Sequence, residues 1–257
     1  MRLFILTSVT SKDFNDLETD VFRDENEFVP SLTANKATAY FHRVAQLLEE
    51  VRLFLARKRP DDTKTVSTAE EFVERGEALD EAMTGWSKNE PGWDLLKVRA
   101  GIAGTMWALY PTHARYHFCS FWVYLYWIRF LTARIKLYEG LIELQKQLAR
   151  APADQRFTTT APKLKISKYE TIIQTTASEL IGLTAYALGD VTPTGGFNSS
   201  ASARGVQEIN VIAAMQLVIP LKMLQRSKYP TATQKGAVDL AISHIGDGFR
   251  RQPLMLI

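Results

Sequence analysis

The chain has 257 residues, of which 46% are hydrophobic and 23% charged, so it is long enough to bury a substantial core. Its 31 basic and 28 acidic side chains are mixed along the sequence and leave a net charge of +3, which excludes a large single-sign surface for holding DNA directly. The single cysteine excludes a disulfide framework and a zinc site built from thiolates. The apolar stretches at 118–128 and 211–224 are shorter than the about 18 residues of a membrane span, so no membrane partner is expected.

Residues 1–33 are predicted to form an acidic segment in front of a helical domain that spans residues 34–257. Within this segment, Phe14, Leu17 and Val21 lie at helical spacing among carboxylates. This pattern indicates either an amphipathic helix that rests on the core or an acidic surface for a partner. The segment lacks the central glycine and the alternating oxygen ligands of a calcium loop, so no calcium site is expected.

The first half of the helical domain contains two clear helical patterns. Apolar residues recur at steps of three and four over residues 36–59, which predicts a helix. Ser67 and Glu70 form a capping-box pattern, so a second helix is predicted to begin at Ser67 and to end before Pro91. The following segment, Trp93 to Ala108, contains two glycines and is predicted to be a packed connection.

The longest apolar segment, Tyr116 to Leu148, is predicted to be a helix at the centre of the fold. Its first half is apolar on all sides, and a helix of that kind packs against neighbours on several faces. Trp122, Tyr126 and Trp127 lie in this half. These three side chains either fill a solid core or line a ligand pocket.

Three further helices are predicted in the C-terminal half, at 167–189, 206–224 and 233–249, with loops near 151–166 and 190–204. Ser167 and Glu170 repeat the capping-box pattern at the start of the first of them. Pro220 predicts a kink or a break in the second, because proline lacks the backbone N–H. No alternating strand pattern competes with these helices. The expected fold class is therefore all-α, a multi-helix bundle.

The sequence motifs of known reaction centres are incomplete in this chain. His113 and His117 stand four apart, but Ala114 takes the place of the glutamate that zinc proteases use as a base. Cys119 begins an apolar run, where a buried and inert thiol is typical. We therefore expect no enzyme, no catalytic residue, no metal ligand and no cofactor in this chain.

Four groups of residues occur in an order that resembles the regulatory middle and C-terminal region of fungal zinc-cluster transcription factors. They are Leu79-Asp80-Glu81-Ala82 with Trp86 and Pro91-Gly92-Trp93; Tyr110-Pro111 with Trp122, Tyr126-Trp127 and Thr132-Ala133-Arg134-Ile135; Ala177-Ser178-Glu179-Leu180-Ile181 with Tyr186-Ala187-Leu188-Gly189; and Ile242-Ser243-His244-Ile245-Gly246. Two departures are visible, because Ile128 stands where the family has asparagine and the cysteine of the third group is replaced. The likeness covers about residues 34 to 250.

The resemblance implies a helical regulatory domain that acts in transcription through protein contacts. It implies other transcription proteins, or a separate zinc-cluster module, as partners, with DNA reached only indirectly and a homodimer as a further option. The expected location is the nucleus, with the cytoplasm as the alternative. The family's DNA-binding module holds two zinc ions with six cysteines, and one cysteine does not suffice for it. The alternative function is a helical small-molecule binder or enzyme with an apolar cavity beside Trp122 to Trp127.

Overall fold

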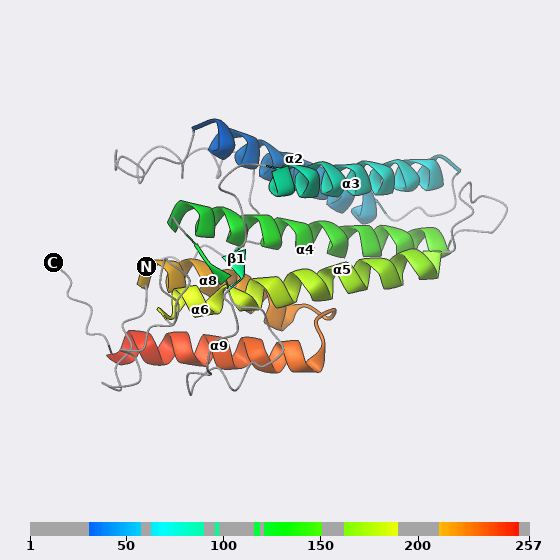
Figure 1. Cartoon of the computed structure of the whole chain (residues 1–257). Coiled ribbons are helices and arrows are strands. Elements are labelled where there is room, and N and C mark those ends of the chain that lie inside the picture. The colour runs from blue at the N-terminus through cyan, green and yellow to red at the C-terminus, as the bar shows by residue number, and fades with distance from the viewer. Residues whose placement is uncertain are drawn as a thin grey trace.

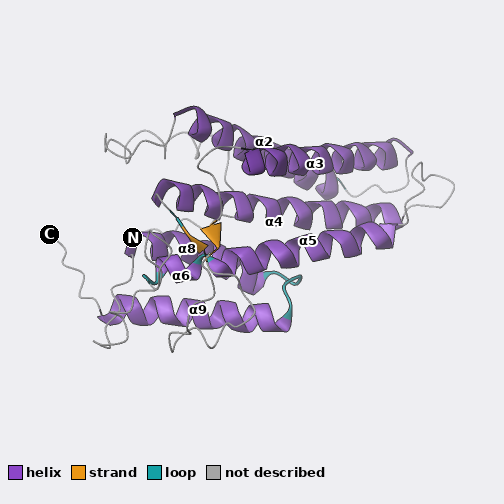
Figure 2. Ribbon diagram, viewed as in Figure 1, coloured by secondary structure: helices purple, strands orange, loops and turns teal. Residues whose placement is uncertain are grey.

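The computed structural model describes residues 31–57, 63–89, 96–97, 116–118, 121–150, 162–189 and 211–251. Within these ranges the chain is all-α apart from two strands of two residues each, as the sequence predicts (Figure 2). The elements are α2 (Ser31–Ala56), α3 (Thr63–Asn89), β1 (Leu96–Lys97), β2 (Tyr116–His117), α4 (Phe121–Arg150), α5 (Pro162–Gly182), α6 (Thr184–Ala187), α8 (Val211–Arg226) and α9 (Ala232–Arg251).

The helices lie in three layers (Figure 1). α2 and α3 form one outer layer, α4 and α5 form the middle layer, and α6, α8 and α9 lie on the other side. α4 contacts α2, α3, α5 and α8, so the longest apolar segment of the sequence does form the centre of the fold. A helix can be buried by four neighbours only if most of its faces are apolar, which is the pattern that the sequence displays.

The core follows α4 along most of its length. Tyr124, Leu131, Ile135, Ile142 and Leu144 are fully buried on this helix. Each aliphatic side chain of this kind stabilises the folded state by about 1.5–3 kcal/mol when it leaves water. Leaving these residues unpaired with α2, α3, α5 and α8 would expose a continuous apolar surface, so the layered packing is the direct consequence of the α4 sequence.

Two predicted helix starts are wrong, because both helices begin before their capping-box residues. α3 begins at Thr63 and α5 begins at Pro162, so Ser67 and Ser167 lie inside helices. In α3 the additional turn buries Val66 against the core, and this packing extends the helix beyond the local signal. In α5 the first position is a proline, whose fixed φ suits a helix start and whose missing N–H is not needed there. The predicted loop near 151–166 therefore ends before residue 162.

α2 differs from its predicted bounds at both ends. It begins at Ser31, before the predicted start at Lys36, and it ends at Ala56, before the predicted end at Arg59. Arg57, the last described residue of this region, lies in a turn and donates its backbone N–H to the carbonyl of Phe54.

The start of the central segment is not helical. Tyr116 and His117 form β2, which pairs antiparallel with β1, and α4 begins only at Phe121. His117 therefore does not share a helix face with His113, which lies outside the described residues. An apolar run suits a buried strand as well as a helix, and here the backbone pairing with Leu96 and Lys97 decides between them.

α8 continues through Pro220, so of the two predicted outcomes, a kink or a break, the break does not occur. Pro220 removes one backbone donor, and the carbonyl that loses its partner belongs to Gln216, four residues earlier. Gln216 is exposed, so water can take the place of the missing donor. The single helix predicted over 167–189 is interrupted at Leu183, between α5 and α6, but its end at Gly189 is as predicted. Gly189 has a φ of 73°, which glycine adopts without strain.

A capping box that the sequence reading did not recognise starts α9. The hydroxyl of Thr231 accepts the backbone N–H of Gln234 at 3.2 Å, and the Gln234 amide oxygen accepts the N–H of Thr231 at 2.9 Å. The turn before it is held to α4, because Lys228 and Tyr229 both donate to Glu143 Oε1 at 3.0 Å. α9 then runs from Ala232 to Arg251, close to the predicted 233–249.

None of the helices in the described part of the chain has the length and apolarity needed to cross a membrane. Cys119, the predicted loop near 190–204 and the acidic residues before α2 lie outside the described residues.

Candidate functional site

Two carboxylates of α3 point toward α4 and α5 and form the starting point of a polar cluster. Glu77 and Asp80 are three residues apart and therefore share one face of the helix. The same face carries Gly76 and Met83, which are buried. The apolar stripe of α3 thus brings two charged groups into the space where three helices meet.

Asp80 is buried and is bound by two residues of α4. Its Oδ1 accepts a hydrogen bond from Arg134 Nε at 2.7 Å, and its Oδ2 accepts from Arg134 Nη2 at 3.1 Å and from the Tyr138 hydroxyl at 2.6 Å. Arg134 and Tyr138 are one helical turn apart, so both reach the same carboxylate. A two-point contact between a guanidinium and a carboxylate fixes the orientation of both groups as well as their distance.

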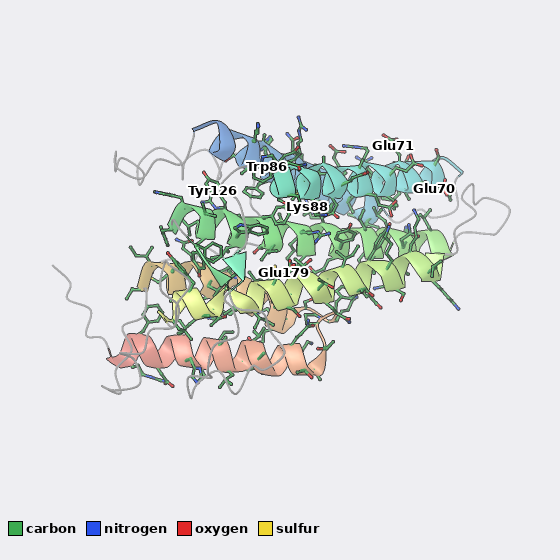
Figure 3. The ribbon with its side chains drawn as sticks, in the orientation of Figure 1. Glu70, Glu71, Trp86, Lys88, Tyr126 and Glu179 are labelled. Atoms are coloured by element: carbon green, nitrogen blue, oxygen red, sulfur yellow. The ribbon has the colours of Figure 1, made fainter. Side chains whose placement is uncertain are left out.

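The charge of Asp80 keeps Arg134 ionised in this enclosed position. Burial lowers the pKa of the guanidinium, but the hydrogen bonds and charge of Asp80 outweigh burial and raise that pKa above its usual value. Glu179 of α5, labelled in Figure 3, adds a weaker favourable charge effect on the pKa of Arg134. Three helices therefore meet around one arginine.

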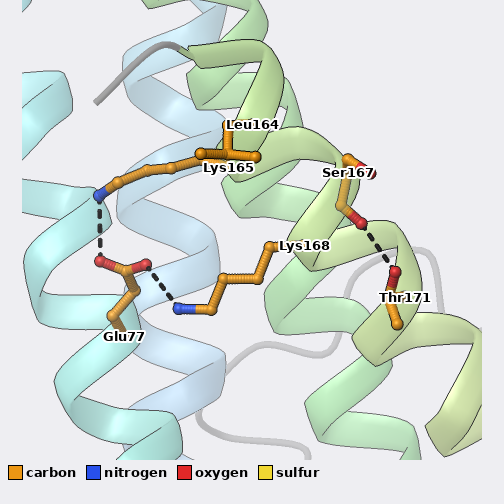
Figure 4. Close-up of a pocket in the computed structure, with 6 residues that line it drawn as sticks. All are labelled: Glu77, Leu164, Lys165, Ser167, Lys168 and Thr171. Carbon is orange, nitrogen blue, oxygen red and sulfur yellow. Dashed lines mark hydrogen bonds and ion pairs between the residues drawn. The ribbon is translucent and has the colours of Figure 1, made fainter.

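Glu77 forms a second set of contacts, with α5. The Tyr169 hydroxyl donates to its Oε1 at 2.8 Å. Lys165 Nζ donates to its Oε2 at 3.2 Å, and Lys168 Nζ lies 3.7 Å from Oε1 (Figure 4). Burial raises the pKa of Glu77, but the hydrogen bonds from Tyr169 and Lys165 outweigh it, so the pKa is lower than usual. The carboxylate is therefore ionised at neutral pH.

The two tyrosines join these contacts into one buried polar cluster, which we define as Glu77, Asp80, Arg134, Tyr138 and Tyr169. The rings of Tyr138 and Tyr169 lie 5.2 Å apart between their centroids. Burial and the neighbouring carboxylates raise the pKa of both hydroxyls, so both remain protonated and donate. The chemistry available in the cluster is hydrogen bonding and ion pairing.

Two open grooves adjoin the buried polar cluster. One, of about 620 Å³, lies between Glu77 and the first turns of α5 (Figure 4). The other, of about 610 Å³, contains Asp80, Arg134 and Tyr138 together with Glu81 and Lys88 of α3. Both are open to solvent, so they are surface grooves rather than enclosed cavities.

The second groove also contains uncommitted polar groups. Glu81 and Lys88 are exposed, and neither pairs with another residue in the described ranges. The hydroxyl of Thr84 is buried beside them and lacks a hydrogen-bond partner within the same ranges. In the described part of the chain, no group of three or more His, Cys, Asp or Glu side chains is arranged to hold a metal ion.

The aromatic residues singled out from the sequence lie elsewhere on α4. Trp127 is buried and meets the Phe130 ring edge-on at 5.2 Å, while Tyr126 stacks on Phe41 of α2 at 6.5 Å. Trp122 is half-buried and contacts the neighbouring Phe121 ring at 6.1 Å. None of the three lines either groove described above. A pocket beside these residues remains a prediction.

The sequence reading did not pair Asp80 with Arg134, and it did not select Glu77, Tyr138 or Tyr169 as site residues. One signal was available for part of the cluster. Glu77 and Asp80 occupy positions of the apolar stripe of α3, and a carboxylate in such a position requires a partner. The identity of that partner depends on which helix packs alongside, which the pattern of one helix does not contain.

Comparisons of this chain with protein-family models, with curated proteins and with solved structures find no match.

Proposed function

We propose that the chain is the regulatory domain of a transcription factor of the fungal zinc-cluster class, or a truncated relative of one. It acts through contacts with other proteins, and it reaches DNA only through a partner or a separate zinc-cluster module. Its place of action is the nucleus. The proposal rests on the order of the four residue groups that resemble that family.

The observation that carries the proposal is the meeting of three of those groups around one side chain. Asp80 comes from the first group, Arg134 from the second and Glu179 from the third. Charged residues from three of the four groups therefore interact across three helices. This proximity in the fold is consistent with reading the groups together.

The zinc cluster of the family does not fit the residues of this chain. The six cysteines that hold two zinc ions have no counterpart in a sequence with one cysteine. No DNA contact is therefore assigned to any residue, and the proposed activity is one of protein contact alone.

A reporter assay tests the proposal. The full chain is fused to a DNA-binding module of known specificity, and transcription from a reporter that carries the matching sites is measured. We expect transcription to differ clearly from that driven by the module alone. The control is Leu131→Asp, which places a charge at a fully buried position of α4 and should unfold the domain and abolish the change. Reporter output equal to that of the module alone, with the fusion present in the nucleus at the same level, would contradict the proposal.

A further inference from the structure

One face of α8 is apolar and exposed. Ile212, Met215 and Ile219 are exposed by 61%, 58% and 49%, and their spacing of three and four places them along one side of the helix. The opposite side carries Ala213, Leu217 and Leu221, which are fully buried in the core. Large apolar side chains that are exposed singly are ordinary, but three in a row on one helix indicate a surface that is covered in use.

The same side of α8 becomes basic in its last two turns. Lys222 and Arg226 follow Ile219 at three and seven residues, and both are exposed. Neither makes an ion pair or hydrogen bond with another residue in the described ranges. We define the α8 face as Ile212, Met215, Ile219, Lys222 and Arg226.

The sequence before α2 has the complementary pattern. Residues 13–28 contain seven carboxylates and one arginine, so the segment is strongly acidic. Phe14, Leu17 and Val21 are spaced by three and four, which repeats the spacing of the apolar residues on α8. An amphipathic helix with such anchors is a common occupant of an apolar face.

We propose that residues 13–28 dock on the α8 face of the same chain. Phe14, Leu17 and Val21 cover the apolar residues of α8, and the acidic side chains pair with Lys222 and Arg226. Docking shields the face from other proteins, so release of the segment would make it available. The inference does not depend on a role in transcription.

The segment is long enough to span the separation between α2 and α8. α2 packs on α4 and α4 packs on α8, and packed helix axes lie about 8–10 Å apart, so two such steps amount to about 20 Å. Residues 22–30 span up to about 30 Å when extended. The first turns of α2 and of α8 also lie at the same end of the molecule (Figure 1).

The small size of the face favours an occupant from the same chain. A stable dimer buries about 800 Å² on each partner, far more than three partly exposed side chains provide. A short tether instead holds the segment at an effective concentration in the millimolar range, so that a contact too weak for two separate molecules is populated.

Hydrogen exchange on the full chain tests this proposal. We expect the amides of residues 13–28 to exchange about fivefold more slowly than in a synthetic peptide of the same sequence. Ile212→Ser with Ile219→Ser, and separately Lys222→Glu with Arg226→Glu, should restore the peptide rate. Raising the salt concentration from about 0.1 M to about 1 M should also reduce the protection, because the Debye length shortens from about 10 Å to about 3 Å.

Matched controls are available on other helices. Leu53→Ser removes an exposed apolar residue of α2, and Lys163→Glu reverses an exposed charge of α5, and both should leave the protection intact. Exchange of the α4 amides reports in every variant that the fold is preserved.

Three results would overturn the proposal. The first is exchange at the peptide rate in the unaltered chain. The second is protection that survives both pairs of substitutions on the α8 face, since the segment would then dock elsewhere. The third is protection that rises with protein concentration between about 1 μM and about 50 μM, because the occupant would then belong to a second molecule.

Discussion

Neutralising Asp80 should destabilise the fold strongly, because it leaves a charged arginine without its partner in a mostly buried position. Asp80→Asn keeps the size of the side chain but removes the charge that Arg134 and Tyr138 contact. The Arg134 side chain is only 19% exposed. Breaking one side of a buried ion pair costs about 3–5 kcal/mol.

The lower end of that range applies here. Asp80 and Arg134 both line the groove of about 610 Å³, so water can reach part of the unpaired guanidinium in the variant. We expect the free energy of unfolding to fall by about 3 kcal/mol in Asp80→Asn and by a similar amount in Arg134→Met. In the double variant neither charge remains, so the loss should be about 4 kcal/mol and not about 6, a coupling energy of about 2 kcal/mol.

Urea denaturation followed by circular dichroism measures these free energies in the four proteins of the cycle. The matched control is Glu50→Gln, which breaks the ion pair with Arg75 between α2 and α3 at 2.8 Å, where both side chains are 45% exposed. An exposed pair contributes less than about 1 kcal/mol. If the losses in Asp80→Asn and Arg134→Met add within about 0.5 kcal/mol, the pair is not coupled and the reasoning is refuted.

Two further predictions concern the other polar contacts and the packing of α3. Burial raises the pKa of Glu143, but hydrogen bonds from two lysines and a tyrosine outweigh it and hold the pKa at about 2, below the usual 4.5. A lowered carboxyl pKa stabilises the fold above pH 4.5, and this contribution is lost as the pH falls toward 2. Because the Glu143 side chain is 45% exposed, Glu143→Gln should lower the free energy of unfolding by only about 1 kcal/mol at pH 7. At pH 2 the substitution should have almost no effect. Urea denaturation across this range tests it, and a pH-independent difference between the two proteins would contradict it. Gly76→Ala should lower the free energy of unfolding by about 1 kcal/mol, because a Cβ at that position lies 2.6 Å from the Leu141 side chain. On the same helix, a Cβ at Gly85 meets nothing within 4 Å, so Gly85→Ala should raise the free energy of unfolding by up to about 1 kcal/mol. Thermal melts measure the stability of the two variants. An equal change in melting temperature in both would contradict the role assigned to packing at Gly76.

The helix boundaries show where local sequence signals are sufficient and where they are not. α9 begins and ends within two residues of its prediction, because its own capping box and apolar spacing agree. α3 and α5 begin earlier than their capping-box patterns. In α3, packing of the preceding turn overrides the local preference of Ser67, whereas in α5 the helix start is set by Pro162, ahead of Ser167. A capping box contributes about 1 kcal/mol, which is less than the burial of one large side chain such as Val66.

The candidate site was predictable only in part for the same reason. A carboxylate on the apolar stripe of α3 could be identified from the spacing of one helix. That its partner is Arg134, 54 positions later in the chain, could not, because several arginines and lysines have suitable positions on their own helices. The grooves beside the cluster likewise exist only once α3, α4 and α5 are packed side by side.

The sequence by itself therefore determined that the chain is helical and that the segment after residue 116 is central. Each of these properties depends on residues within about 30 positions of one another, where helix spacing and capping act. The tertiary structure alone decided that Tyr116 and His117 pair as a strand, that Asp80 meets Arg134, and that one face of α8 stays uncovered by its helical neighbours. These depend on which surfaces meet across the chain, and that choice is made by the burial of the whole apolar core around α4 rather than by any local pattern.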